Sequence, residues 1–417
     1  MEIYYKSRDI ELSKNKLEDS KDKFEYKRNG ETLQKFLEIS NLEISNNVNE
    51  NFFDENDFKR LIKTFVSSFI NKSFDNIIVL AGAGASVVTE KGMINENYGK
   101  TIRMIAELVE QKLSENEYYS LEQLATMSKF ENELYKNDKE LSNDFNLEDF
   151  LSNLIQYEKY VENKKKDKFL RSKNKILDII KEDVRYEYNS EIMKHGELIK
   201  ILSDKIKSPN KLSVVTTNYD ILFEEAANEL NFTVIDGFSF TYKPKFDIDI
   251  FEWNLVKNIP NIRTKEVEYK KNIINLLKIH GSLTWEIEDE DIYRGLQNEI
   301  DNPVMVFPSS KKYYQSYQKP YFELFSKFQE LLKQNNTLLI TTGFSFCDNH
   351  IAKMITQAIL NNSSLSILIT DFNISQDHIN WKELEKLMTQ GYRISFLKAT
   401  LNGDLTDYLG DENIDNR

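Results

Sequence analysis

The most informative stretch of the chain is Asn76-Ile77-Ile78-Val79-Leu80-Ala81-Gly82-Ala83-Gly84-Ala85-Ser86. An apolar, β-branched run ends in Gly-Ala-Gly-Ala-Ser, and a long helical pattern follows, which predicts a strand, a tight turn and a helix. Such a turn lets backbone N–H groups approach a diphosphate, with a helix N-terminus behind them. The third glycine of the dinucleotide fingerprint and the Gly-Lys-Ser/Thr of a P-loop are absent. The stretch alone therefore does not identify a ligand.

Size and composition fit either one large α/β domain with insertions or two to three domains, because the chain has 417 residues, of which 40% are hydrophobic and 29% charged. The formal net charge of −13 argues against nucleic-acid binding unless basic residues cluster. The clearest basic run is Lys164-Lys165-Lys166-Asp167-Lys168. Because acids are interspersed on the same helical pattern, a solvated helix face is favoured over a phosphate-binding patch.

The chain has one cysteine, Cys347, which excludes an internal disulfide and a cysteine-rich zinc site. The N-terminus lacks the apolar region of a signal peptide, and no segment approaches the roughly 18 consecutive apolar residues of a membrane span. We therefore expect a cytoplasmic protein without a membrane segment.

The pattern along the chain predicts three regions. Residues 1–53 are polar and mixed, and we expect an N-terminal appendage whose strands pack on the main body or on a neighbouring subunit. Residues 54–417 form one α/β domain. Within it, apolar residues recur at helical spacing from about residue 100 to residue 207, and no convincing strand interrupts them. This pattern indicates a helical insertion.

Short apolar runs alternate with helical patterns through the C-terminal half. Strands are predicted at 77–80, 212–217, 232–235, 274–279, 304–307, 337–342, 365–370 and 393–397. This alternation predicts an α/β fold with a doubly wound, largely parallel sheet covered by helices on both faces. Ligands of such sheets bind at the C-terminal ends of the strands.

Five loops that follow predicted strands carry unusual residues, and topology predicts that they converge on one crevice. These loops are Gly82-Ala83-Gly84-Ala85-Ser86, Thr216-Thr217-Asn218-Tyr219-Asp220, His280-Gly281-Ser282, Gly343-Phe344-Ser345-Phe346 and Asp371-Phe372-Asn373. Each residue also has a structural interpretation. Asp220 could cap a helix, Asn218 could sit in a turn, His280 could be a buried structural histidine, and Asp371 could cap a turn.

In this order and spacing, the loops resemble the sirtuin signature over roughly residues 75–400. Thr217-Asn218-Tyr219-Asp220 and Gly343-Phe344-Ser345-Phe346 are most similar to the bacterial sirtuin-like antiviral proteins, which consume NAD+. The resemblance implies a Rossmann-like, sirtuin-like sheet and an antiphage effector that hydrolyses NAD+ to ADP-ribose and nicotinamide.

Two departures from deacetylase sirtuins are informative. The segment Val87-Val88-Thr89-Glu90-Lys91-Gly92-Met93-Ile94 replaces their Gly-Ile-Pro-Asp-Phe-Arg, and the acidic run Glu286-Ile287-Glu288-Asp289-Glu290-Asp291 stands where they carry a four-cysteine zinc module. We therefore expect no zinc, and NAD+ hydrolysis rather than protein-lysine deacetylation.

The resemblance implies that Asn218 and His280 are catalytic. Expected NAD+ contacts are Gly82, Ala83, Gly84, Ala85, Ser86, Thr217, Tyr219, Asp220, Gly281, Ser282, Gly343, Phe344, Ser345, Asp371 and Asn373. In this reading the amides of Ala83 to Ser86 hold the diphosphate, and Asp371 and Asn373 contact the adenosine. Histidine side chains in general can transfer protons near neutral pH, which fits a catalytic role for His280.

The resemblance also implies control by assembly, because an unregulated NAD+ hydrolase would kill its host. A homo-oligomer with a HerA-type ATPase partner is expected, and a short Argonaute is the alternative partner. Two other classes stay open: a non-catalytic scaffold that binds NAD+ or ADP-ribose, and, less favoured by the charge, a nuclease-like effector.

Overall fold

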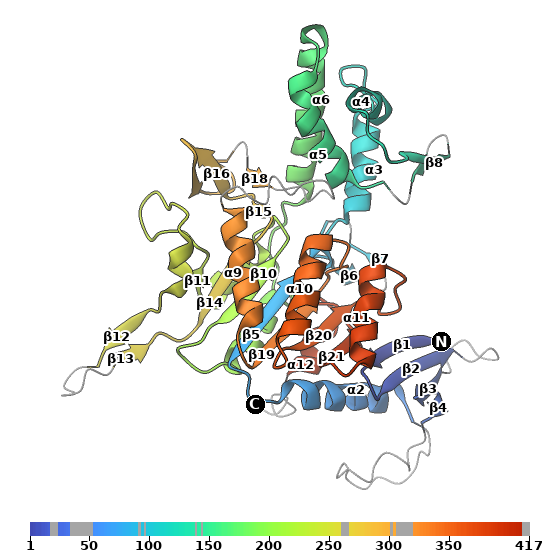
Figure 1. Ribbon diagram of the computed structural model, residues 1–417, viewed down its shortest axis with the longest axis vertical. Coiled ribbons are helices and arrows are strands. Elements are labelled where there is room, and N and C mark those ends of the chain that lie inside the picture. Colours follow the sequence, from blue (N-terminus) through green and yellow to red (C-terminus); the bar gives the residue numbers. More distant parts are fainter. Residues whose placement is uncertain are drawn as a thin grey trace.

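The dominant feature of the computed structural model is an 11-stranded sheet with helices on both faces (Figure 1). The structure describes residues 1–16, 24–33, 53–90, 93–95, 97–137, 140–142, 145–259, 267–300, 303–305 and 320–410. Within these ranges, no helix combines the length and apolarity needed to cross a bilayer.

Seven parallel strands form the centre of the sheet and confirm the predicted doubly wound α/β fold. Their order is β11 (Thr233–Ile235), β14 (Ile273–Lys278), β10 (Leu212–Thr216), β5 (Asn76–Ala81), β19 (Thr337–Thr342), β20 (Ser366–Asp371) and β21 (Ile394–Lys398). The strands β10, β11 and β14 are added on one side of β5, with β14 inserted between β10 and β11, and β19, β20 and β21 are then added on the other side. The strand order therefore reverses between β5 and β19, which is where such sheets bind ligands.

The N-terminal strands extend this sheet. β1 (Glu2–Lys6) pairs antiparallel with β21, and β2 (Glu11–Lys16), β3 (Phe24–Arg28) and β4 (Glu31–Thr32) follow in order. Tyr5, Leu12 and Tyr26 are buried in the core under one face of the sheet. Residues 34–52, which belong to the predicted appendage, lie outside the described residues.

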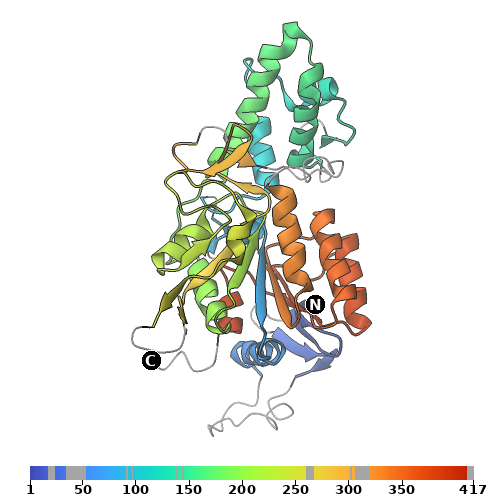
Figure 2. The ribbon, with the colours of Figure 1, turned by 60° about the vertical axis from the view of Figure 1, so that its left-hand side comes forward.

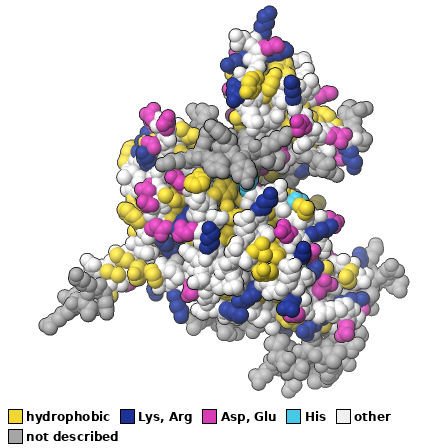
Figure 3. Space-filling model, in the orientation of Figure 1, with side chains coloured by type: hydrophobic (Ala, Val, Ile, Leu, Met, Phe, Trp, Pro, Cys, Tyr) yellow, Lys and Arg dark blue, Asp and Glu magenta, His cyan; other side chains and the backbone are white. Residues whose placement is uncertain are grey.

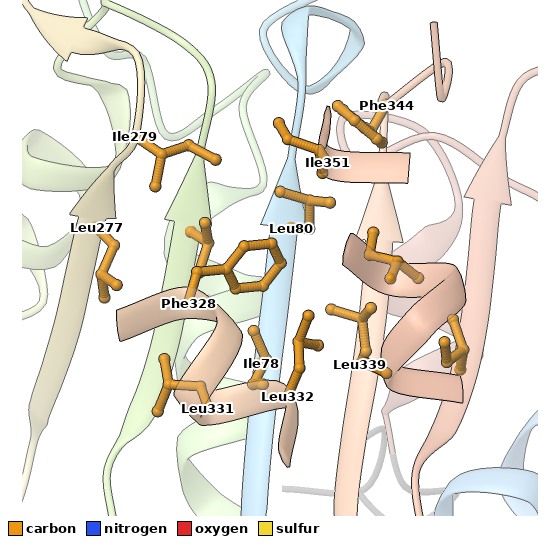
Figure 4. Packing of buried hydrophobic residues seen from close by; sticks show 14 of the residues in the cluster. Ile78, Leu80, Leu277, Ile279, Phe328, Leu331, Leu332, Leu339, Phe344 and Ile351 are labelled. Carbon is orange, nitrogen blue, oxygen red and sulfur yellow. The ribbon is translucent and has the colours of Figure 1, made fainter. Parts of the chain in front are cut away.

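The two faces of the sheet carry separate cores, because successive side chains of a strand point to opposite sides. Ile78 and Leu80 of β5 pack against Phe328 and Leu332 of one helix layer (Figure 4). This layer contains α9 (Tyr321–Lys333), α10 (Asn349–Asn361) and α11 (Ile379–Thr389). The opposite face is covered by α2 (Glu55–Ile70), α7 (His195–Asp204), α8 (Leu222–Glu229) and α12 (Leu405–Leu409).

A helical lobe stands over the C-terminal ends of the parallel strands (Figures 1 and 2). It contains α3 (Ile102–Lys112), α4 (Leu121–Ser128), α5 (Leu147–Tyr157) and α6 (Asn163–Asp183), which bury a core of their own. Contrary to expectation, a short hairpin of β8 (Tyr135–Asn137) and β9 (Glu140–Leu141) interrupts these helices. The predicted insertion also reached 207, but α7 packs on the sheet next to α8.

The basic run on α6 faces neighbours within the lobe. Lys165 pairs with Glu162 at 3.3 Å, and the nearby Lys173 pairs with Glu158 at 2.6 Å. Lys168 donates to the backbone oxygen of Asn116 at 2.9 Å. Figure 3 shows basic, acidic and apolar side chains mixed on the lobe, as expected for a solvated helix surface.

Small two-stranded sheets occupy several connections. They are β6 (Thr89–Glu90) with β7 (Met93–Ile94), β12 (Val256–Asn258) with β13 (Val267–Tyr269), β16 (Trp285–Glu288) with β17 (Asp291–Arg294), and β15 (Gly281–Ser282) with β18 (Val304–Met305). The predicted strand at 304–307 is therefore not part of the main sheet as far as it is described. The acidic run becomes the β16–β17 hairpin, whose turn residues Asp289 and Glu290 have positive φ angles of 49° and 71°.

Candidate functional site

A deep pocket of about 790 Å³ lies at the C-terminal ends of the parallel strands. Ligand sites typically measure roughly 300–1,000 Å³. The loops after β5, β10, β14, β19 and β20 all contribute to its walls, as the topology predicts. The predicted residues that line it are Gly82, Ala83, Gly84, Ser86, Thr217, Asn218, Tyr219, Asp220, His280, Gly343, Phe344, Ser345 and Asp371.

Four predicted contacts do not line the pocket. Ala85 is fully buried behind the glycine-rich turn. Gly281 and Ser282 pair with Val304–Met305 instead. Asn373 lies outside the pocket and accepts a hydrogen bond from the Ser375 amide at 2.9 Å. These positions support neighbouring segments rather than the pocket surface.

Glycines allow the loops after β5 and β19 to touch at the point where the strand order reverses. A Cβ atom on Gly84 would lie 2.8 Å from the Cα of Gly343, and one on Gly82 would lie 2.6 Å from the Gly343 carbonyl oxygen. Gly343 itself has a φ of 59°, which favours glycine. The Gly-Ala-Gly pattern is thus required by loop-to-loop packing.

Most of the amides expected to hold a diphosphate make hydrogen bonds within the structure. The Gly84 amide donates to Gly343 at 3.0 Å, the Ala85 amide to Gly82 at 2.9 Å, and the Ser86 amide to Ala83 at 3.2 Å. Among the described residues, the Ala83 amide alone in this turn makes no backbone hydrogen bond. The turn continues as a short 3-10 helix, Ala83–Ala85, and the next α-helix begins only at Ile102, so no helix N-terminus stands directly behind it.

A hydrogen-bond chain fixes Asn218. Its Nδ2 donates to Ser86 Oγ at 2.9 Å, and Ser86 Oγ donates to Asp220 Oδ2 at 2.7 Å. Asp220 also accepts from the amide of Leu222, the first residue of α8, at 3.2 Å, so it joins this chain to the start of the helix. Burial raises the pKa of Asp220, although Lys278 and Ser86 act in the opposite direction. The side-chain nitrogen of Asn218 is therefore engaged in this chain of hydrogen bonds, and the side-chain oxygen is the polar atom that remains.

A buried lysine holds the backbone of this loop. The ammonium of Lys278, on β14, donates to the carbonyl oxygens of Tyr219 at 3.3 Å and of Asp220. It also pairs with Glu224 at 2.8 Å. Because Lys278 is only 1% exposed, these partners are what make its burial tolerable.

His280 lies beside a carboxylate that the sequence did not single out. Its Nε2 is 3.4 Å from Asp348 Oδ2, at ion-pair distance. Asp348 caps α10 by accepting from the amides of His350 at 2.9 Å and Ile351 at 3.1 Å. Burial alone would raise the pKa of Asp348, but contact with His280 and these two amides lower it overall. The sequence does contain a signal for Asp348, because this residue stands directly before a helical pattern and shortly after a loop that ends a strand.

The lobe also lines the pocket, with Asn146, Leu147, Glu148 and Asp149 at the start of α5. Asn146 caps this helix by accepting from the amides of Glu148 at 2.8 Å and Asp149 at 3.2 Å. Burial, followed by the negative charges of Asp348 and Asp149, raises the pKa of Glu148 to about 8. Sequence reasoning missed this group, because the helical spacing did not reveal that the insertion returns to the strand ends.

Asp371 lines the other side of the strand-order reversal, after β20. Its Oδ1 accepts from the Asn373 amide at 3.0 Å, so it caps a turn. Burial is the main reason that its pKa is raised to about 6, which the two turn amides only partly offset.

The comparison with protein families supports this view of the fold. The family model described as SIR2-like domain matches residues 212–388, somewhat less than half of the chain. The match includes Asn218, His280, Gly343 and Asp348, and excludes the glycine-rich turn and the lobe. No curated protein matches the chain. The chain is thus similar to Sir2-family proteins, whose activities in general depend on NAD+.

Proposed function

We propose that the protein hydrolyses NAD+ to ADP-ribose and nicotinamide. The observation that carries the proposal is the arrangement of Asn218 and His280 on one pocket, each with a carboxylate close by. Asn218 is tied to Asp220 through Ser86, and His280 lies beside Asp348.

The reaction breaks the bond between the ribose C1 and the nicotinamide nitrogen. The leaving group starts as a cation and departs neutral, so it needs no general acid, while positive charge develops on the ribose. Asn218 can hold a ribose hydroxyl or the attacking water through its amide oxygen. His280, held beside the carboxylate of Asp348, can take up a proton from one of these groups.

Hydrolysis is favoured over lysine deacetylation by the segment after His280. Deacetylases of the sirtuin type build a zinc module there, whereas this chain folds the β16–β17 hairpin and contains one cysteine in total. The surface that would help to form an acyl-lysine cleft is therefore built differently.

The test is NAD+ consumption by the purified chain and by two variants. His280→Ala and Asn218→Ala should each abolish turnover while the thermal unfolding temperature stays close to that of the wild type. Asn116→Ala, an exposed lobe position, is the matched control and should remain active. Equal NAD+ consumption by all four proteins would refute the proposal.

A second candidate is a scaffold that binds NAD+ or ADP-ribose as a signal. The deep pocket at the strand-order reversal favours binding as such. Tight NAD+ binding by the wild-type chain without product formation, with or without a partner, would identify this alternative.

We further propose that the enzyme is a bacterial antiphage effector that depletes cytoplasmic NAD+ as a homo-oligomer assembled with a HerA-type ATPase. The support is the family resemblance, together with the two exposed additions to the fold: the lobe and the N-terminal strands. Native mass measurement of the chain alone and with the ATPase tests this assembly. A monomer in both samples, or a complex formed instead with a short Argonaute, would contradict it.

A further inference from the structure

The pocket has a carboxylate that comes from the lobe rather than from the sheet. Glu148 is the second residue of α5, and it lines the same pocket as Asn218, His280 and Asp348. The proposed reaction as derived above makes no use of it. Its position lies outside the stretch that matches the SIR2-like domain, so the family comparison assigns it no role.

The backbone of Glu148 is firmly placed. The Asn146 cap accepts from its amide at 2.8 Å, and Phe150, Leu151 and Leu154 on the same helix are fully buried in the lobe core. Such a cap typically stabilises a helix start by about 1 kcal/mol. Glu148 therefore reaches the pocket from a rigid element, as positioned catalytic groups do.

The lobe core also includes the catalytic loops. Tyr219, next to Asn218, and Leu283, three residues after His280, are buried among the lobe side chains. The Leu283 amide donates to the Tyr219 carbonyl at 3.1 Å, which links the two loops. The position of Glu148 relative to Asn218 and His280 is thus fixed by continuous packing.

Two carboxylates on the pocket have opposite electrostatic environments. Asp348 has His280 and two amides beside it, which keep its pKa low, whereas Glu148 faces like charges and has its pKa raised to about 8. Pairs of titratable groups whose pKa values diverge in this way are typical of acid–base sites. The other titratable groups on the pocket walls are Asp149 on α5, His280 after β14, Tyr219 and Asp220 after β10, His350 and Lys353 on α10, Lys100 before α3, Tyr186, Cys347 and Asp371.

We propose that Glu148 is a catalytic carboxylate of the proposed hydrolysis and accepts the proton of the attacking water. In this step the water oxygen forms a bond to the ribose C1, and the bond from C1 to the nicotinamide nitrogen breaks with its electron pair leaving on nicotinamide. The water proton passes to Glu148 and then to solvent. The inference rests on the proposed NAD+ hydrolysis.

The position of Glu148 on the pocket also predicts that a proton is released when NAD+ binds. The nicotinamide ring of NAD+ is cationic, and a nearby positive charge favours the ionised carboxylate. A Glu148 that is protonated at pH 7 in the free protein therefore loses its proton when NAD+ enters. This change occurs before any chemistry, so it can be measured without turnover.

The first experiment measures this proton by calorimetry in the full chain. NAD+ is titrated at pH 7 in buffers of different ionisation enthalpy, with Asn218→Ala as the inactive background. We expect proton release in Asn218→Ala, none in Asn218→Ala/Glu148→Gln, and unchanged release in Asn218→Ala/Glu122→Gln. Glu122 is the matched control because it is the exposed second residue of α4 in the same lobe. Equal release in all three proteins overturns the inference.

The second experiment measures turnover. Loss of a general base typically costs 10²–10⁴-fold, so Glu148→Gln should lower kcat by about this factor with little change in KM, and Glu148→Asp should recover part of it. The rise of kcat/KM toward pH 8 should disappear in Glu148→Gln. An active wild type with an equally active Glu148→Gln overturns this inference alone, whereas a wild type that neither binds nor cleaves NAD+ overturns the proposed function as well.

Discussion

At the scale of single residues, Asp348 has two separable tasks. It caps α10 and it places a negative charge beside His280. Asparagine is as good an N-cap as aspartate, so Asp348→Asn should change the free energy of unfolding by less than about 1 kcal/mol while it lowers kcat clearly. Asp348→Ala should lower kcat as well and cost a further ~1 kcal/mol in stability. Denaturant unfolding and NAD+ turnover of both variants separate the two tasks, and an unchanged kcat in Asp348→Asn would exclude the electrostatic one.

Asp371 makes the stability of the fold depend on pH. Its pKa is raised from 3.8 to about 6 in the folded state, so the ionised carboxylate opposes folding above pH 6, and this cost disappears as the pH falls toward 4. Asp371→Asn should therefore stabilise the protein at pH 8 by roughly 1–3 kcal/mol and have no effect near pH 4. Unfolding curves at both pH values provide the measurement. A pH-independent difference would show that the carboxylate is not the cause.

Sequence position was sufficient to place Asn218 and His280 on the pocket, because each follows a buried strand at the edge where parallel sheets bind ligands. It was not sufficient for Asp348 or Glu148. Asp348 is the N-cap of α10 and Glu148 lies in the first turn of α5, where acidic residues are common for structural reasons, and their approach to the pocket depends on how these two helices pack. A capping pattern in the sequence indicates the local backbone geometry, whereas the set of side chains that meet in a pocket depends on how distant elements pack together.

At the scale of elements, the contact between the turns after β5 and β19 depends on glycine. An added Cβ on Gly343 would overlap the Ala85 backbone, and the φ of 59° would strain any other residue. Gly30, with a φ of 85° and open space around it, provides a control for the conformational effect alone. We expect Gly343→Ala to lower the free energy of unfolding by at least ~1 kcal/mol more than Gly30→Ala. Both substitutions introduce a similar backbone strain of about 1–2 kcal/mol, but Gly343→Ala adds a steric clash. Chemical unfolding of the two variants measures this difference, and equal losses would argue against the loop contact.

Continuous apolar runs made the seven parallel strands predictable, since such strands are buried on both faces. The small two-stranded sheets were not predictable in the same way. Strands of two or three residues, such as those of the β8–β9 and β15–β18 pairs, carry too few side chains for a periodic signal. The close contact of the turn glycines with Gly343 was not predictable for a related reason, because this partner lies about 260 residues away in the chain.

At the scale of the whole molecule, the N-terminal strands are structural members of the main sheet. β1 covers the edge of β21, and Tyr5 and Leu12 complete one of the two cores. Removal of residues 1–33 should expose this edge and lower the unfolding temperature, because unpaired strand edges promote aggregation. Thermal unfolding and light scattering of the truncated chain test this. A truncated chain that stays monodisperse and equally stable would show that the strands serve another purpose.

The order of strands in the sheet has a consequence for how the protein is made. The central strand β5 is synthesised first among the parallel strands, yet one neighbour, β10, follows about 130 residues later and the other, β19, about 250 residues later. At 5–20 residues per second, a ribosome needs about 12 to 50 seconds to complete both partners. Until β10 and then β19 have been made, β5 lacks these permanent neighbours, so nascent chains should depend on chaperones, and the pocket cannot be complete until translation is almost finished.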